Sequence, residues 1–270
     1  GSGKSTTLAA MIEHRNATRG GHVLTIEDPI EFVYTNNKCV INQREVGQDT
    51  LSYDNALVNA MREAPDVLLI GEVRDRQTLQ HALLYGQTGH LCLTTLHANN
   101  SYHALGRIIN FFPHDARDGL LHDLSTTLRA IISQRLVKGV DGSMVAAVEI
   151  MLNTKHIAEL VKKGEIDQIK EAMEQSLSPG SETFEQALFK LYSQGLITKD
   201  DALKNSDSPS NLAWLLDNAG VGKAGKAGGT SMFGMPGAGG GGHGSSSAGV
   251  PSALTTTGGI SIDLDRLDRT

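Results

Sequence analysis

Short apolar runs alternate with helical patterns through the N-terminal part of the chain, and this alternation constrains the fold most strongly. The apolar runs are His22–Ile26, Asp66–Ile70 and His90–Leu96, with a further β-like run at Lys38–Asn42. Apolar residues recur at helical spacing over Thr6–His14, Tyr53–Glu63 and Arg76–Tyr85. A repeated strand–helix order predicts an α/β fold with a mostly parallel sheet and helices on both faces.

The pattern changes after Asn100, where helical segments dominate. Helices are predicted at Tyr102–Phe111 and Ala116–Ser133, and two β-like runs, Gln134–Val137 and Met144–Ile150, flank a turn signal at Gly139–Gly142. The remaining helical segments are Ile157–Lys163, Asp167–Gln175, Glu182–Gln194 and a last piece that ends near Leu216. We therefore expect a core domain over residues 1–150 and a helical C-terminal subdomain over residues 151–217.

The C-terminal stretch differs in composition from the rest of the chain. Glycine accounts for 30 of the 270 residues, and 15 of these lie between Gly220 and Thr270. The stretch has almost no large apolar side chains, so it cannot bury enough surface to offset the entropy of the chain. We expect a disordered Gly/Ser-rich tail over residues 218–270.

Charge and apolar content argue against two classes of protein. The net charge is −6, and residues 1–219 carry 20 Lys/Arg against 27 Asp/Glu, so we expect no nucleic-acid partner. No apolar run has the length that a membrane span needs. The two cysteines, Cys39 and Cys92, lie in β-like or apolar runs, and we expect two buried thiols in a reducing compartment.

The chain opens on the second half of a phosphate-binding loop, Gly1-Ser2-Gly3-Lys4-Ser5-Thr6, and a helical pattern follows it. The free N–H groups at a helix start attract phosphate, and glycine lets the phosphate approach the backbone. Lys4 would reach the β- and γ-phosphates of ATP, and the Ser5 hydroxyl would be a ligand of Mg²⁺. Because the loop is cut, we expect the chain to be a fragment whose preceding strand lies upstream.

Acidic residues follow two of the apolar runs. Glu72 comes directly after the run Leu68–Gly71. In a nucleotide hydrolase, an acid at the end of such a strand polarises the attacking water or holds Mg²⁺ through water. The acids Glu27, Asp28 and Glu31 follow Thr25-Ile26 around Pro29. They would position water and Mg²⁺ in a nucleotide site, and the spacing alone is equally consistent with solvated acids in a turn.

Two histidines and two arginines complete the candidate residues. His90 and His97 stand at opposite ends of one apolar run, too far apart to share a metal ion, and at least one of them fits a sensor of the γ-phosphate. Arg44 and Arg74 flank strand ends and are candidates for stabilising charge in the transition state, in cis or across a subunit interface. The alternative for each arginine is a weak surface ion pair.

These blocks, in this order, resemble the secretion and type IV pilus ATPase superfamily. Its Walker A motif, aspartate box, atypical Walker B motif and histidine box are matched by Gly1–Thr6, Thr25–Phe32, Leu68–Asp75 and Thr88–Ser101. The blocks Asn42–Glu45 and Ser133–Leu136 also fit, and the resemblance extends to the region of Leu216.

Within the superfamily the chain looks like the PilT/PilU family of type IV pilus retraction ATPases. The tetracysteine metal site of the pilus-assembly motors is absent, since the chain has only 2 cysteines. PilT members usually carry an AIRNLI-type motif, whereas the corresponding Ile157–Val161 lacks the arginine. Together with Ser176–Phe184, this difference indicates a PilU-like accessory retraction ATPase.

The resemblance implies a RecA-like P-loop core and a hexameric ring with ATP and Mg²⁺ sites between subunits. It implies that Glu72 is the Walker B glutamate, that Glu27 and Glu31 are aspartate-box acids, and that His97 or His90 contacts the nucleotide. Other implied features are a PAS-like N-terminal domain outside this chain, a PilT-like ATPase partner and an inner-membrane platform protein. The implied location is cytoplasmic, peripheral at the inner membrane.

Three functions stay open from the sequence. The first is an ATP hydrolase that powers pilus retraction and twitching motility. The second is an accessory or regulatory subunit of a PilT-containing motor, and the third is a pilus-assembly or type II secretion ATPase. We expect the 270-residue chain alone to be weak or inactive as an ATPase.

Overall fold

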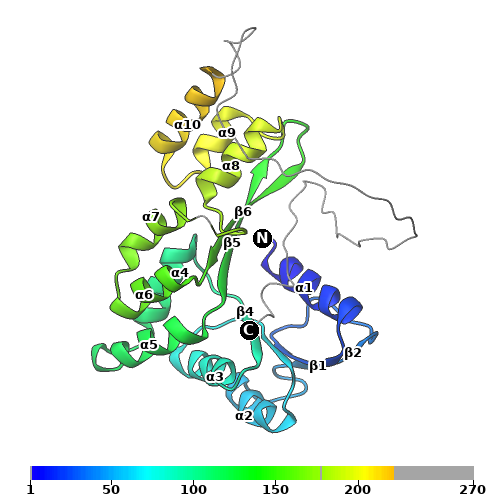
Figure 1. Cartoon of the computed structure of the whole chain (residues 1–270). Coiled ribbons are helices and arrows are strands. Elements are labelled where there is room, and N and C mark those ends of the chain that lie inside the picture. Colours follow the sequence, from blue (N-terminus) through cyan, green and yellow to red (C-terminus); the bar gives the residue numbers. More distant parts are fainter. Residues whose placement is uncertain (1, 177, 222–270) are drawn as a thin grey trace, which may run out of the picture.

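A computed structural model describes residues 2–176 and 178–221 of the chain, and its N-terminal half alternates helices and strands (Figure 1). The elements of this half are α1 (Lys4–Thr18), β1 (Gly21–Glu27), β2 (Cys39–Glu45), α2 (Tyr53–Glu63), β3 (Val67–Ile70), α3 (Arg76–Gln87) and β4 (Leu91–Thr94). The strand–helix order predicted from the apolar runs is confirmed.

Strands β1 to β4 form one parallel sheet in the order β2-β1-β3-β4. The central strand β1 pairs Ile26 with Arg44 of β2 on one side and with Ile70 of β3 on the other. Because the strands are parallel, their carboxyl ends meet at one edge of the sheet, where ligands of α/β proteins usually bind. The predicted α/β class with a mostly parallel sheet is therefore confirmed.

Helices cover both faces of this sheet. On one face Val23 and Leu69 pack with Ile12 of α1. The face under α2 and α3 buries Leu24, Ile26, Leu68, Ile70, Leu57 and Tyr85. Burial on both faces explains why the sequences of these strands are nearly continuous apolar runs.

The C-terminal half is mainly helical and contains one antiparallel hairpin. Its elements are α4 (Ser101–Asn110), α5 (Arg117–Thr127), β5 (Ala130–Lys138), β6 (Met144–Leu152), α6 (Lys155–Lys163), α7 (Ile169–Glu174), α8 (Phe184–Ser193), α9 (Lys199–Lys204) and α10 (Pro209–Val221). Short 3-10 helices, η1 (His114–Ala116) and η2 (Ile166–Gln168), precede α5 and α7. The predicted hairpin turn is confirmed, with Gly142 in the left-handed region at φ +84°.

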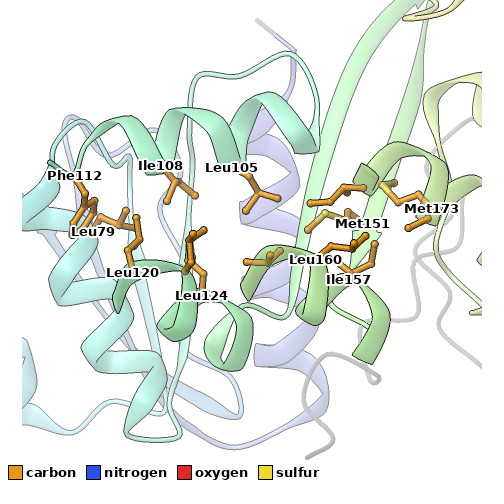
Figure 2. Close-up of a cluster of buried hydrophobic side chains, with 14 of the residues drawn as sticks. Leu79, Leu105, Ile108, Phe112, Leu120, Leu124, Met151, Ile157, Leu160 and Met173 are labelled. Carbon is orange, nitrogen blue, oxygen red and sulfur yellow. The ribbon is translucent and has the colours of Figure 1, made fainter. Parts of the chain in front are cut away.

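The largest buried apolar cluster joins helices α3 to α7 (Figure 2). In it Leu105 of α4 and Leu124 of α5 meet Leu160 of α6, with Met151 of β6 and Met173 of α7 beside them. A second cluster packs α8, α9 and α10 against the hairpin of β5 and β6. The first cluster contains residues on both sides of position 150, and the division into a core and a helical subdomain stays a prediction.

The predicted helix Ala116–Ser133 is wrong in its last part. Helix α5 ends at Thr127, and β5 already begins at Ala130. The side-chain amide of Asn153 donates to the carbonyl oxygens of Ser125 (3.0 Å) and Leu128 (2.8 Å), and these contacts stabilise the end of the helix. The extended chain that follows pairs residue by residue with β6, which gives nine paired positions from Ala130 to Lys138.

Two other predictions need correction near the ends of elements. Helix α10 continues through Val221, with the Asn218 side chain donating to the Trp214 carbonyl oxygen at 2.9 Å, so the predicted tail does not begin at residue 218. Residues 222–270, which hold the rest of that prediction, lie outside the described residues. Cys39 is buried as expected, whereas Cys92 is partly exposed because β4 is an edge strand.

No helix among the described residues combines the length and the apolar content that crossing a membrane requires.

Candidate active site at the carboxyl edge of the sheet

The carboxyl edge of the sheet collects the acidic and histidine candidates. Glu27 ends β1, Glu72 follows β3, and His97 follows β4. Helix α1 has 15 residues and β1 has 7, so both elements are about 22 Å long. Since a short turn joins them and reverses the chain, the start of α1, with Lys4, lies at the same edge as Glu27.

The carboxylate of Glu72 is the centre of a charged group at this edge. Its Oε1 forms an ion pair with the Arg74 guanidinium, and its Oε2 lies 3.3 Å from Nε2 of His97. The side chain of Glu72 is 16% exposed, while that of Arg74 is 61% exposed. Arg74 first, and His97 after it, lower the pKa of Glu72 against the opposing effect of burial. Glu72 is therefore ionised at neutral pH.

The glycine before Glu72 holds three strand ends together. The Gly71 N–H donates to the Ile26 carbonyl oxygen at 2.8 Å, and its carbonyl oxygen accepts from Thr95 Oγ1 at 2.6 Å. A Cβ at this position would lie 3.0 Å from the Tyr53 hydroxyl oxygen and 3.3 Å from Cα of Glu27. A side chain would therefore push the ends of β1 and β3 apart, which explains why a glycine precedes the acid.

The second acidic group is only partly brought to the cluster. Glu27 accepts hydrogen bonds from Thr25 Oγ1 (2.6 Å) and Gln43 Nε2 (3.4 Å), so its carboxylate is fixed in orientation. The carboxylate of Asp28 lies 4.0 Å from Arg74, which places this guanidinium between two acids. Glu31 is exposed in the segment between β1 and β2.

The phosphate loop has a conformation that only glycine adopts readily. Gly3 has φ +88° and precedes α1, and no side chain caps the start of this helix. The free end therefore offers backbone N–H groups to an anion. A Cβ at Gly3 would lie 2.8 Å from Nε2 of Gln134, and Gln134 Oε1 accepts from Thr7 Oγ1 at 2.8 Å.

Gln134 is a residue of this site to which sequence reasoning gave no role. It lies on β5, and Figure 1 shows the N-terminal end of the chain beside that strand. The one sequence signal was the block Ser133–Leu136, which fits the family without indicating a contact.

Two candidates lie away from the Glu72 cluster. The His90 ring precedes β4, at the opposite edge of the sheet, where it lies 5.1 Å from the Tyr85 ring. Arg44 forms an ion pair with Glu63 of α2 at 2.6 Å. Of the two histidines, the structure brings His97 to Glu72, and the predicted roles of His90, Arg44 and Glu31 stay predictions.

The residues present fit a nucleotide phosphate with Mg²⁺. Lys4, Ser5 and Thr6 form the first turn of α1, and Ser2 lies beside them in the loop. The prediction for Gly1 lies outside the described residues. Mg²⁺ prefers oxygen ligands and keeps several waters, and a serine hydroxyl at the same edge of the sheet as the Glu72 carboxylate matches that preference.

The part of the chain that holds these site residues matches a known protein family. The sequence model of the family described as Type II/IV secretion system protein matches residues 1–163, a stretch that holds Lys4, Glu27, Glu72 and His97. The chain belongs to the type II/IV secretion system protein family.

Within this secretion system family, the predicted resemblance to PilT and PilU is confirmed. The chain is 50% identical over 217 residues to the type IV pilus ATPase PilU of Pseudomonas aeruginosa, covering 80% of this chain and 57% of that protein. It is 43% identical over 212 residues to the PilT retraction ATPase of the same species, covering 78% of this chain and 62% of that protein.

A solved structure of the family has the same fold. The crystal structure of the pilus retraction motor PilT with bound ADP matches with a TM-score of 0.74 and 42% identity, over 79% of this chain and 61% of that chain. The chain thus spans from 57% to 62% of the length of these three relatives.

Proposed function

We propose that this chain forms the ATPase part of a motor that hydrolyses ATP to power retraction of type IV pili. The observation that carries the proposal is the ionised Glu72, held by Arg74 and His97 at the edge where α1 begins with Lys4. The names of the relatives, a pilus ATPase and a pilus retraction ATPase, support the direction of the activity.

Each residue has a role that follows from its charge and position. Lys4 and the N–H groups at the start of α1 bind and orient the phosphates. ATP would supply the phosphoanhydride bond, and the Mg²⁺ bound with it would neutralise charge on the transferred group. Because its pKa is lowered, Glu72 is a weak base, and it orients the attacking water by accepting a hydrogen bond. Arg74, whose side chain is 61% exposed, holds Glu72 and is a candidate for stabilising charge on the transferred phosphate.

The assembly and location follow from the family and are part of the proposal. The chain forms a hexamer in which a neighbouring subunit supplies an arginine to the ATP site. It works with a PilT-like ATPase and an inner-membrane platform protein, on the cytoplasmic side of the inner membrane. Residues 1–150 are the ATPase core, and residues 151–217 form the helical subdomain.

Two related functions use the same chemistry. A pilus-assembly or type II secretion ATPase would have the same site, because the hydrolysis step does not set the direction of force. An accessory subunit of a PilT-containing ring would bind nucleotide at the same residues, and the 50% identity to PilU favours it as the second candidate.

Complementation of a strain lacking this protein tests the proposal. The strain receives the wild-type gene, Glu72→Gln, or the control Glu182→Gln, whose carboxylate lies 3.9 Å from Lys190 beside α8. Wild type and the control should restore twitching and normal numbers of surface pili, whereas Glu72→Gln should leave the cells hyperpiliated and non-motile.

Other outcomes of the complementation assign the alternatives. Normal motility with Glu72→Gln would exclude Glu72 as a required residue. If cells with Glu72→Gln have normal motility only when an active PilT-like partner is present, the chain has the accessory role. A deletion strain without surface pili would assign assembly instead of retraction.

A further inference from the structure

Tyr53 is the first residue of α2, and its hydroxyl is buried at the carboxyl edge of the sheet. The Ser52 side chain caps α2 by accepting a hydrogen bond from the Asn55 N–H at 3.1 Å. This bond fixes the first turn of the helix, and therefore the position from which the Tyr53 side chain leaves the backbone. The hydroxyl oxygen is shielded from solvent and has no hydrogen-bond partner within residues 2–176 and 178–221. Buried hydroxyls in folded proteins nearly always have a partner, because an unpaired one loses its hydrogen bonds to water.

The atoms around this hydroxyl belong to the candidate active site. The hydroxyl oxygen lies 3.0 Å from the position that a Gly71 Cβ would take, and Cα of Glu27 lies 3.3 Å from the same position. Tyr53 therefore sits between the end of β1 and the turn that leads to Glu72. Burial first, and then the charges of Asp28 and Glu72, raise the pKa of Tyr53 to about 12. The phenol keeps its proton at physiological pH and is a hydrogen-bond donor.

Four other side-chain donors near Glu27, Gly71 and Glu72 are already engaged. Thr25 and Gln43 donate to the Glu27 carboxylate. Thr95 donates to the Gly71 carbonyl oxygen, and Arg74 forms an ion pair with Glu72. Among these donors, the Tyr53 hydroxyl alone has no partner in the described part of the chain.

We infer that Tyr53 is a positioning residue of this site, whose hydroxyl donates a hydrogen bond to an ordered water held by Glu27 and Glu72 beside the terminal phosphate. The inference rests on the proposed function. Ionised carboxylates only accept hydrogen bonds, so such a water turns both of its hydrogens toward the acids. Its oxygen then has two lone pairs, one that accepts from Tyr53 and one that faces the phosphorus. Tyr53 thereby fixes the direction of attack.

The variant Tyr53→Phe removes one oxygen atom and leaves the ring in place. Its matched control is Tyr85→Phe on α3, because Tyr85 is a buried tyrosine whose hydroxyl has a partner: it donates to the Ala60 carbonyl oxygen at 3.4 Å in the apolar layer under α2. The two variants make the same chemical change, one at the carboxyl edge and one in the core.

Equilibrium titrations of the 270-residue chain separate the ground state from the transition state. The probes are ADP with Mg²⁺, and ADP with Mg²⁺ and aluminium fluoride, which mimics the phosphoryl group in transfer together with its attacking water. For Tyr53→Phe we expect unchanged affinity for ADP and about fivefold to tenfold lower affinity for the aluminium fluoride complex. Tyr85→Phe should bind both probes as wild type does.

The outcomes distinguish this inference from the proposed function. The inference fails if wild type and Tyr53→Phe bind the aluminium fluoride complex with equal affinity, or if Tyr53→Phe loses the same affinity for both probes. Tyr53 would then contribute only the packing of its ring. A wild-type chain that binds no ADP would overturn the proposed function, and the inference with it.

Thermal unfolding without nucleotide is a second readout. The unfolding temperature of Tyr53→Phe should equal or exceed that of wild type, since the variant loses only an unpaired hydroxyl. A clearly lower temperature would mean that the hydroxyl is bonded within the protein, and would overturn the inference.

Discussion

At the scale of single residues, two buried or half-buried glutamates show opposite electrostatic behaviour. Glu72 has an arginine and a histidine beside its carboxylate, so its pKa is lowered. Glu149 of β6 is 3% exposed and accepts the Ser101 N–H at 2.7 Å, and burial raises its pKa. The first is therefore ready for chemistry at neutral pH, whereas ionisation of the second costs stability because burial disfavours its charged form.

That cost predicts a pH-dependent effect of Glu149→Gln. The pKa of Glu149 in the folded state lies above its value of about 4.5 in the unfolded state. The stability that protonated Glu149 contributes is therefore present below pH 4.5 and is lost as the pH rises through the folded-state pKa. The free energy of unfolding of Glu149→Gln, relative to wild type, should therefore increase as the pH rises from about 4 to 7. Denaturant unfolding at several pH values measures it.

The exposed Glu159 offers a matched control for this titration. Glu159→Gln makes the same chemical change at the surface and removes no buried carboxylate. A difference between Glu149→Gln and wild type that stays constant with pH would contradict the assignment of the raised pKa to burial.

At the scale of elements, β5 links the phosphate loop to the helices at the C-terminal end. Successive residues of a strand point to opposite faces. Gln134 accepts from Thr7 of α1, while Arg135 forms an ion pair with Asp207 at 2.5 Å and lies 3.9 Å from the centre of the Phe184 ring. Strand β5 therefore contacts α1 through Gln134, and α8 and the segment before α10 through Arg135.

The contact of Gln134 predicts an effect on nucleotide binding. Gln134→Ala removes the acceptor of the Thr7 hydroxyl and the support of the loop at Gly3, so the affinity for ADP should fall about threefold to tenfold. The control Gln175→Ala loses a bond only to the exposed Glu171, at 3.0 Å. Equal ADP affinities of Gln134→Ala and Gln175→Ala in equilibrium titrations would show that β5 does not support the loop.

At the scale of the whole molecule, the cluster of Figure 2 makes the two expected domains interdependent. Leu160 of α6 is buried among residues of α4 and α5, so Leu160→Ala should lower the free energy of unfolding by about 2–5 kcal/mol. The whole described chain should unfold in one transition. Far-UV circular dichroism and the fluorescence of the single tryptophan, Trp214 of α10, should report the same midpoint. Separate midpoints would mean that the helical subdomain unfolds independently.

The parts of the molecule that the sequence predicted are those governed by local pattern. Continuous apolar runs identify β1, β3 and β4, and the residues that follow parallel strands share one edge, which brought Glu27, Glu72 and His97 into the predicted site. The parts that were missed depend on distant contacts. The end of α5 is stabilised by Asn153, and the contact of Thr7 with Gln134 joins residues 127 positions apart. No local pattern indicates such contacts, and none indicates the orientation of the Tyr53 hydroxyl.

The affinity of Lys4→Ala for nucleotide shows whether the start of α1 and the Glu72 cluster form one ATP site. The wild-type chain should bind ATP with Mg²⁺, and Lys4→Ala should bind it about 30-fold or more weakly, because the phosphates lose a charged hydrogen bond. The control Lys155→Ala, at the exposed start of α6, should bind as wild type does. Equal affinities of Lys4→Ala and wild type would mean that the start of α1 does not bind the phosphates of ATP.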